Sequence, residues 1–269
     1  KKEEIFRQEG WSYQLENVEG PLKYNGVVYN EMKGAFSSPD EVLEREIMNS
    51  LFPDTPYGCE SGGDPDHIPE LSYEEFLEFH KTYYHPSNSY IYLYGNMDMA
   101  EKLAFIDEHY LSAFERLDVD SEIRRQEPFE KRKDLVMEYP VSESESEEGN
   151  SYLAYSTVVG DASDVLTGTA FEVLDYALLS APGAPLKQAL LDAQIGMDVY
   201  GSYDDGIMQP YFDIVAKGTD PDKKEKFVEI IRTTLEDIAA NGIDRKALDA
   251  GINCMEFRYR EADFSSWPK

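Results

Sequence analysis

The sequence has little cysteine and little histidine, and this limits the metal and thiol chemistry that it can perform. Two cysteines, Cys59 and Cys254, lie far apart in a chain of 269 residues. Their spacing indicates neither a disulfide framework nor a cysteine metal site. A reducing compartment follows, and we predict a cytoplasmic protein. No two of the four histidines enclose three residues of which the third is glutamate, so the metal-binding pattern H-x-x-E-H is absent from the sequence.

The other missing features exclude further classes of protein. No apolar run reaches the length of a membrane span. The segment Lys1–Phe6 has two lysines but no apolar core behind them, so no signal peptide is indicated. Lysine and arginine number 25 against 54 acidic residues, a net charge of −29. This charge argues against binding to nucleic acid. It is compatible with the attraction of cationic peptides, although solubility alone also accounts for it.

Nucleophilic and phosphate-binding motifs are missing as well. No Ser/His/Asp or Cys/His arrangement can be argued, and Cys254 lies in an apolar helical stretch that is typical of a protein core. The run Gly62–Pro65 lacks the lysine and helix start of a phosphate loop, and we interpret it as a turn. His80 and His85 are spaced too widely for one helix face, so a structural role at the helix end before Pro86 is expected.

The hydrophobic fraction of 41%, with 19 Tyr and 13 Phe, predicts a soluble globular protein whose length permits two domains. In the first half, strands are expected at 12–16 and 89–95, and helices at 26–34, 39–51, 72–84 and 99–114. Val42, Ile47 and Leu51 should face inward from the second of these helices. Phe76 and Phe79–His80 should lie on a buried face of the third. A charged, aperiodic linker is predicted at 118–133.

The second half repeats this layout. Strands are expected at 135–139, 152–159 and 211–216, the last with alternating burial. Helices are expected at 165–179, 184–194, 221–242 and from Asp244 onward. The acidic run Glu143–Glu148 is interpreted as a solvated loop. Two similar units of strands and paired helices predict an α+β fold made of two similar domains, each an antiparallel-rich sheet packed with helices.

The segment Gly26–Gly34 contains one carboxylate, Glu31, in a mostly apolar setting. Such a glutamate is either a solvated helix residue or a group held inward for chemistry, because charged side chains are rarely buried without a partner. Sequence physics alone favours the solvated interpretation.

Many short segments, in one order along the chain, resemble the presequence-protease branch of the pitrilysin/insulinase-like zinc peptidases. Besides Gly26–Gly34, they are Gln8–Trp11, Ser37–Asp40, Leu51–Asp54, Ser61–Pro65, Ile68–Leu71, Phe79–Asn88, Tyr94–Asn96, Gly206–Phe212 and Arg260–Phe264. The resemblance implies a zinc metalloendopeptidase that hydrolyses peptides in an enclosed chamber. It also implies that Glu31 is the third protein ligand of the catalytic zinc. Residues 1–126 would be the C-terminal part of the zinc-bearing domain, and residues 127–269 a second, noncatalytic domain of the same fold.

One departure from the family is clear. Its H-x-x-E-H helix, which supplies two histidine ligands and the general base, does not occur in this sequence. The resemblance therefore implies a fragment that is inactive alone, holds no zinc alone, and is completed upstream and by a complementary C-terminal half. A noncatalytic scaffold subunit of the same fold is the alternative.

Overall fold

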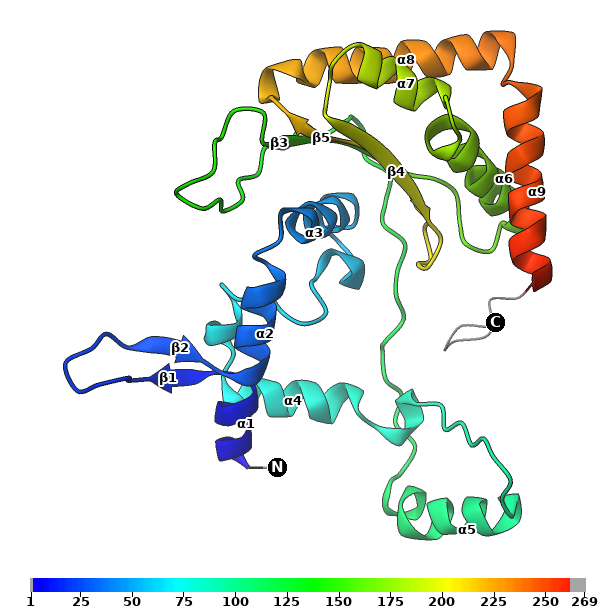
Figure 1. Ribbon diagram of the computed structural model, residues 1–269. Helices are drawn as coiled ribbons and strands as arrows, with labels where there is room; N and C mark the ends of the chain where they lie inside the picture. The colour runs from blue at the N-terminus through cyan, green and yellow to red at the C-terminus, as the bar shows by residue number, and fades with distance from the viewer. Residues whose placement is uncertain (1, 262–269) are drawn as a thin grey trace. The chain divides into compact units, whose positions relative to one another are not determined.

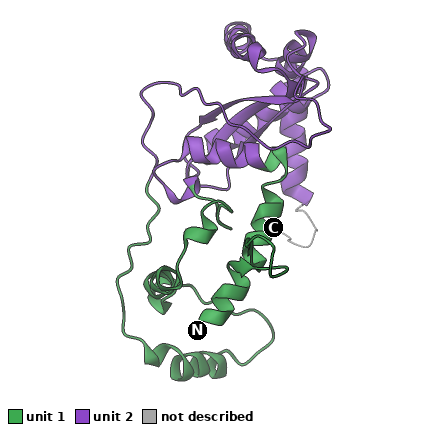
Figure 2. Ribbon diagram, turned by 90° about the vertical axis from the view of Figure 1, so that its left-hand side faces the viewer, with its two compact units in different colours: residues 1–41, 59–124 green, residues 42–58, 125–269 purple. Residues whose placement is uncertain are grey.

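A computed structural model describes residues 2–261. The last three residues of the segment Arg260–Phe264 lie outside the described part. Contacts divide the chain into two compact units, coloured in Figure 2: unit 1 is Lys1–Glu41 with Cys59–Arg124, and unit 2 is Val42–Gly58 with Arg125–Lys269. The expected domains, 1–126 and 127–269, remain a prediction. The contact units depart from that division because residues 42–58 belong with the second unit.

Unit 1 is built mainly from helices (Figure 1). Its strands β1 (Ser12–Gln14) and β2 (Lys23–Asn25) form an antiparallel hairpin, with Tyr13 opposite Tyr24. The helices are α1 (Glu3–Glu9), α2 (Val27–Ala35), α4 (Tyr73–Tyr83) and α5 (Met99–His109). Helix α4 begins where the sequence predicts, and its start is a capping box in which Ser72 and Glu75 satisfy each other's backbone N–H groups.

The core of unit 1 is small. Among its described residues, Phe6 and Trp11 are the buried large hydrophobic side chains, at 6% and 9% exposure. Phe6 packs against Tyr73 and Phe76, with ring centroids 5.7 and 5.3 Å away. The Trp11 indole N–H donates to the carbonyl of Leu71 at 2.9 Å. These contacts connect helix α1 and the hairpin to the start of helix α4.

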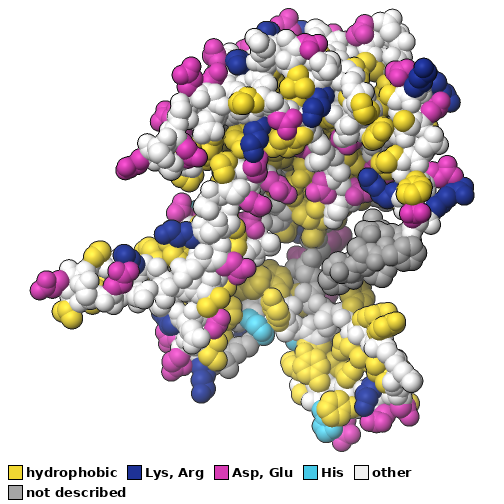
Figure 3. Space-filling model, viewed as in Figure 1, with side chains coloured by type: hydrophobic (Ala, Val, Ile, Leu, Met, Phe, Trp, Pro, Cys, Tyr) yellow, Lys and Arg dark blue, Asp and Glu magenta, His cyan; other side chains and the backbone are white. Residues whose placement is uncertain are grey.

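Two expectations for unit 1 are wrong. Residues 89–95 are not a strand, and Tyr90, Tyr92 and Tyr94 are almost fully exposed. A strand needs backbone partners, and the described residues place none beside this segment. The buried face expected on helix α4 is also absent, since Phe76 and Phe79 are 40% and 59% exposed. Figure 3 shows apolar side chains gathered on the surface of this part of the chain.

Unit 2 contains a three-stranded antiparallel sheet in the order β3-β5-β4. The strands are β3 (Ser151–Val158), β4 (Asp198–Asp204) and β5 (Tyr211–Thr219). Strand β5 was expected to alternate in burial, but residues 211–216 are all buried, because the strand lies between two neighbours and is covered on both faces. The strand expected at 135–139 is absent, and β4 was not predicted.

Helices cover this sheet. They are α6 (Val165–Asp175), which continues into a π-helical turn (Tyr176–Ser180), α7 (Pro185–Asp192) and α8 (Lys224–Asn241). Helix α9 (Arg245–Glu261) packs on α6 and on the π-helical turn. Figure 1 shows α7 and α8 along one face of the sheet. The main core joins them: Leu186, Leu190 and Phe227 pack with Phe212 and Ile214 of β5. The helix ends agree with the sequence, since Gly242 follows α8 and Asp244 caps α9.

Helix α3 (Pro39–Leu51) buries the three residues that its spacing predicts, Val42, Ile47 and Leu51. With Phe52, which is completely buried, its C-terminal end packs against Tyr211 at the start of β5. No helix among the described residues is long and apolar enough to cross a membrane.

A polar connection secures this second cluster. The side chain of Gln126, 6% exposed, accepts a hydrogen bond from the Asp54 N–H at 2.9 Å and donates to the Asp54 carboxylate at 2.8 Å. Its backbone N–H donates to the side chain of Gln209 at 2.6 Å, and the Gln209 amide donates back to the Gln126 carbonyl at 3.1 Å. Three segments distant in sequence are thereby joined.

The α+β fold class expected from the sequence is confirmed.

The structure allows two predictions. In the first, limited proteolysis should cut first at the exposed chain near Arg124 with trypsin and at Glu143–Glu148 with a glutamate-specific protease. Both stretches are exposed and lack helices and strands, and backbone of this kind is nicked most readily. Arg125 should be cut less, because Asp161 holds its guanidinium at 2.6 Å. First cuts inside α3 or α8, identified by mass spectrometry, would contradict this.

The second prediction concerns Phe52. Phe52→Ala should lower the free energy of unfolding by roughly 3–5 kcal/mol, since it removes a fully buried aromatic ring and leaves a cavity. Phe257→Ala, at a ring that is 63% exposed, is the matched control and should change stability by less than about 0.5 kcal/mol. Urea unfolding of the purified variants measures both. Equal stabilities would show that the α3 cluster contributes nothing to unit 2.

Candidate metal ligand on helix α2

Helix α2 begins directly after the hairpin. Gly26 is its N-cap, and Asn25, the last residue of β2, pairs with Ser12 of β1. The backbone N–H of Tyr29 donates to the carbonyl of Gly10 at 3.3 Å. The Asn30 side-chain amide donates to the Asn25 side-chain carbonyl at 2.8 Å. The first turn of α2 is therefore tied to the base of the hairpin.

Glu31 lies in the middle of α2, and its side chain is exposed. Its neighbours three and four positions away share its helix face, and they are Val27, Val28, Gly34 and Ala35. Val27 and Val28 are 53% and 37% exposed, and α2 buries none of its residues. A solvated helix face is normally polar. Here an exposed carboxylate is instead surrounded by apolar and small residues that nothing among the described residues covers.

The loop that follows α3 also contacts α2. A Cβ at Gly62 would lie 2.2 Å from the sulfur of Met32, the residue next to Glu31. Gly63 has a φ of +91°, a conformation that favours glycine. The interpretation of Gly62–Pro65 as turn chemistry agrees with this geometry, and the contact with α2 is a feature that sequence reasoning missed.

The histidines make structural contacts. His85 accepts a hydrogen bond from the Ser87 N–H at 3.1 Å, and His80 stacks on Tyr84 with centroids 4.6 Å apart, which confirms the helix-end role. The ring of His109 lies against Phe105, with centroids 4.6 Å apart. His67 contacts Glu70 at 3.0 Å, and this hydrogen bond, with the charge of Glu70, raises the pKa of the imidazole.

The described residues do not form a complete metal site. A carboxylate oxygen is a suitable zinc ligand, but a catalytic zinc needs about three protein ligands. No group of three or more His, Cys, Asp or Glu side chains within residues 2–261 could hold a metal ion. Cys59 and Cys254 are free and exposed. A carboxylate oxygen of Glu31 is chemically suited to be one zinc ligand, and residues 2–261 supply no further ligands beside it.

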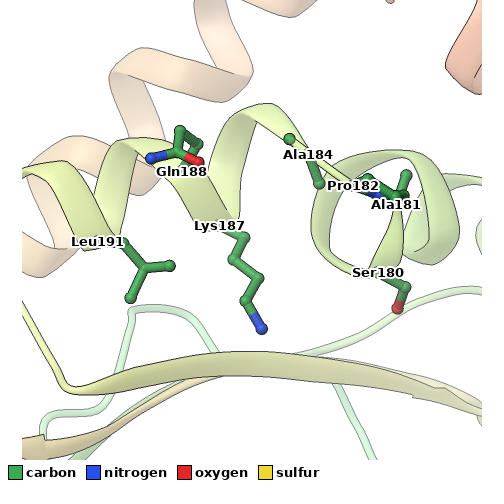
Figure 4. Close-up of a pocket in the computed structure, with 8 residues that line it drawn as sticks. Ser180, Ala181, Pro182, Ala184, Lys187, Gln188 and Leu191 are labelled. Atoms are coloured by element: carbon green, nitrogen blue, oxygen red, sulfur yellow. The ribbon is translucent and has the colours of Figure 1, made fainter.

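A small hollow lies in unit 2. It encloses about 250 Å³ and is lined by the turn before α7 and by one side of that helix. Figure 4 shows Lys187 and Leu191 directed to the same side of the helix. The Lys187 ammonium lies 3.3 Å from the Asp198 carboxylate. Ser180 also lines the hollow, and its hydroxyl donates to the Asp175 carboxylate at 3.4 Å.

Buried ionisable groups of unit 2 lie in strand β5. Burial raises the pKa of the Asp213 carboxyl, although the hydroxyl and N–H of Ser202 donate to it at 2.6 and 3.0 Å. Burial, with the nearby charge of Asp204, also raises the pKa of Tyr211. On the surface, hydrogen bonds from Ser163 and Arg125 lower the pKa of Asp161 to about 2. These shifts follow from packing and pairing, and none requires a reaction.

Comparison with known proteins places the chain in a family. Residues 70–254 match the family described as the peptidase M16 inactive domain. The chain belongs to the M16 peptidase family. Glu31 precedes the matched range, so this match does not bear on its role.

Two curated relatives extend along the whole chain. Protein HypA of Clostridium perfringens is 52% identical over 268 residues, and presequence protease 1 of Arabidopsis thaliana, chloroplastic/mitochondrial, is 38% identical over 268 residues. They align with 100% and 98% of this chain, which spans 28% and 25% of their own lengths. The resemblance to presequence proteases is confirmed.

Solved structures support the fold. A peptidase M16 inactive domain from Pseudomonas fluorescens has a TM-score of 0.59 at 18% identity, covering 87% of this chain and 54% of its own. Pitrilysin has a TM-score of 0.51 at 17% identity, covering 90% of this chain and 26% of its own. At these identities the likeness concerns the fold alone.

The buried Asp213 gives a test that is independent of Glu31. Its raised pKa means that the native state holds a proton that the unfolded state releases, so its favourable contribution is present at low pH and is lost as pH rises through the native pKa. Asp213→Asn keeps an oxygen for Ser202 and carries no charge. The stability of this variant relative to the parent chain should therefore increase as the pH rises above about 4, the ordinary pKa of an aspartate in the unfolded chain.

Urea unfolding at a series of pH values measures this trend. Asp222→Asn, at an exposed carboxylate, is the control for the loss of one acidic side chain. Parallel stability curves for Asp213→Asn and the parent chain would show that Asp213 titrates as it does in the unfolded state.

Proposed function

We propose that this chain is part of a zinc metalloendopeptidase that hydrolyses peptides in an enclosed chamber, and that Glu31 is one of the zinc ligands. The observation that carries the proposal is the exposed carboxylate on an apolar, uncovered face of α2. The 38% identity with a presequence protease across 98% of the chain supports it.

In this proposal the parts of the chain have different roles. Glu31 supplies a negative charge that offsets the charge of the zinc ion. One oxygen of its carboxylate binds the ion and helps to fix its position. When bound, zinc supplies Lewis acidity toward a peptide carbonyl and toward water. The general base and the histidine ligands belong to an H-x-x-E-H helix elsewhere in the polypeptide. Unit 2 takes no part in the chemistry. It is a folded domain that forms part of the wall of the chamber, and a complementary C-terminal half forms the rest of that wall.

Peptides are the proposed substrates. The net charge of −29 favours cationic ones, because a field of one sign steers oppositely charged ligands toward the protein. We also propose the cytoplasm as the compartment, which the two free, exposed cysteines support.

A noncatalytic scaffold subunit of the same fold is the second candidate. The match of residues 70–254 to an inactive domain favours it. The two functions differ in one sequence feature, since the enzyme requires H-x-x-E-H in the complete gene product. They also differ at Glu31, because a scaffold has no need of a carboxylate there.

Substitution of Glu31 tests the proposed function. In the complete gene product, Glu31→Gln should weaken zinc binding by more than about tenfold, since even partners that only support a ligand contribute about 10–100-fold. Peptide hydrolysis should fall with it. The amide keeps the shape of the side chain and loses the charge. Plasma mass spectrometry of the dialysed protein, with a fluorogenic peptide assay, measures both quantities.

Glu108→Gln, at an exposed glutamate of α5, is the matched control and should retain zinc and activity. The isolated 269-residue chain should bind no stoichiometric zinc and cleave no peptide. Wild-type zinc content and turnover in Glu31→Gln would exclude Glu31 as a ligand. Stoichiometric zinc in the isolated chain would show that the proposed ligand set is wrong.

A further inference from the structure

The connection between strand β2 and helix α2 is unusually close to another part of the backbone. Gly26 is buried at this point. A Cβ on Gly26 would lie 2.2 Å from the carbonyl oxygen of Gly10, 2.7 Å from its carbonyl carbon and 2.8 Å from the Cα of Trp11. All three are backbone atoms, which cannot rotate away as a side chain can. A residue with a side chain therefore fits here only if α2 moves away from the hairpin.

The same contact fixes the first turn of α2. The Gly10 carbonyl that approaches Gly26 also accepts the Tyr29 N–H at 3.3 Å, so it satisfies one of the free donors at the start of the helix. Trp11, the next residue, is buried, and its indole is held by the Leu71 carbonyl. The backbone that Gly26 contacts is thus anchored through Trp11 to the start of helix α4.

Glu31 depends on this contact for its position. Helix α2 buries no side chain of its own, so core packing does not hold it. Its attachments include the Gly10 contact, the Asn30–Asn25 hydrogen bond, the packing of Met32 on Gly62 and the edge contact of the Tyr29 ring with Tyr24 of β2, with centroids 5.8 Å apart. The helix rises about 1.5 Å per residue, so a shift at Gly26 is transmitted to Glu31 little more than one turn away.

We propose that Gly26 is a positioning residue for Glu31: its lack of a side chain lets α2 dock on the Gly10–Trp11 backbone, and this docking sets the place of the carboxylate in the metal site. The proposal rests on the proposed function, in which Glu31 binds the metal. It predicts that Gly26 affects the geometry of the metal site although it lies outside the coordination sphere.

The test uses the complete gene product, loaded with cobalt(II) in place of zinc, whose visible absorption bands report coordination geometry. Gly26→Ala should weaken metal binding at least about tenfold, as expected for the loss of support to a ligand. The cobalt bands should shift or lose intensity. The far-ultraviolet circular dichroism should stay unchanged. Gly20→Ala is the matched control, since its methyl group would meet only the Asn17 side chain at the tip of the same hairpin.

A milder variant covers the case in which Gly26→Ala does not fold. Asn25→Ala removes the acceptor for the Asn30 amide and leaves the backbone contact and the surface of α2 in place. It should change the cobalt spectrum and metal affinity in the same direction by a smaller amount. If the folded variants of Gly26 and Asn25 both keep the parent spectrum and affinity, the positioning role is refuted.

Glu31→Gln, measured in parallel, separates the two proposals. Loss of metal in Glu31→Gln with an unchanged spectrum in Gly26→Ala refutes the positioning role and leaves the ligand assignment standing. Unchanged metal binding in Glu31→Gln refutes the ligand assignment itself.

Discussion

The packing of Phe52 against Tyr211 is the contact on which the organisation of unit 2 depends. It brings the end of helix α3 to the start of strand β5 and buries the apolar side of α3. Gln126 then satisfies the polar groups on both sides, bonding to Asp54 and to Gln209. Because a buried polar group without a partner is costly, these hydrogen bonds permit only one arrangement of the three segments. Two family-like segments, Leu51–Asp54 and Gly206–Phe212, meet here.

Unit 1, in contrast to unit 2, has little buried core. It buries two large hydrophobic side chains among its described residues, while helices α4 and α5 bury none. In the segment 89–95, the exposed rings of Tyr90, Tyr92 and Tyr94 alternate along the sequence with Ile91, which is 49% exposed, and with the half-buried Leu93. This pattern is typical of a strand inside a sheet with both faces covered, and this chain supplies no neighbouring strand among residues 2–261. The local sequence of this segment therefore fits a covered strand better than the exposed position that it has among residues 2–261.

This contrast explains which elements could be predicted from sequence. Helix α4 was predictable because Ser72 and Glu75 encode its start locally, and α3 because the spacing of its apolar residues fixes its buried side. Strands depend on distant partners, so segment 89–95 was predicted and did not form. Strand β4 was not predicted. Val199 is its one buried residue, so its sequence lacks the apolar pattern that identifies a strand. Glu31 was singled out by resemblance and not by physics. The role of Gly26 depends on a contact with Gly10, which no local pattern reveals.

The uncovered face around Glu31 links folding to the proposed chemistry. A carboxylate in water is strongly hydrated, and one ligand holds a zinc ion weakly against its own hydration shell. Covering the valines beside Glu31 would remove water from the carboxylate and strengthen its attraction to a cation, since charges interact more strongly at low dielectric. In the proposed enzyme, the segments that cover this face would also supply the other zinc ligands. Metal binding and completion of this unit would stabilise each other, as expected where a metal site is formed only by folding. Docking of α2 through backbone contacts suits this arrangement, because it holds Glu31 in place before its surroundings are complete.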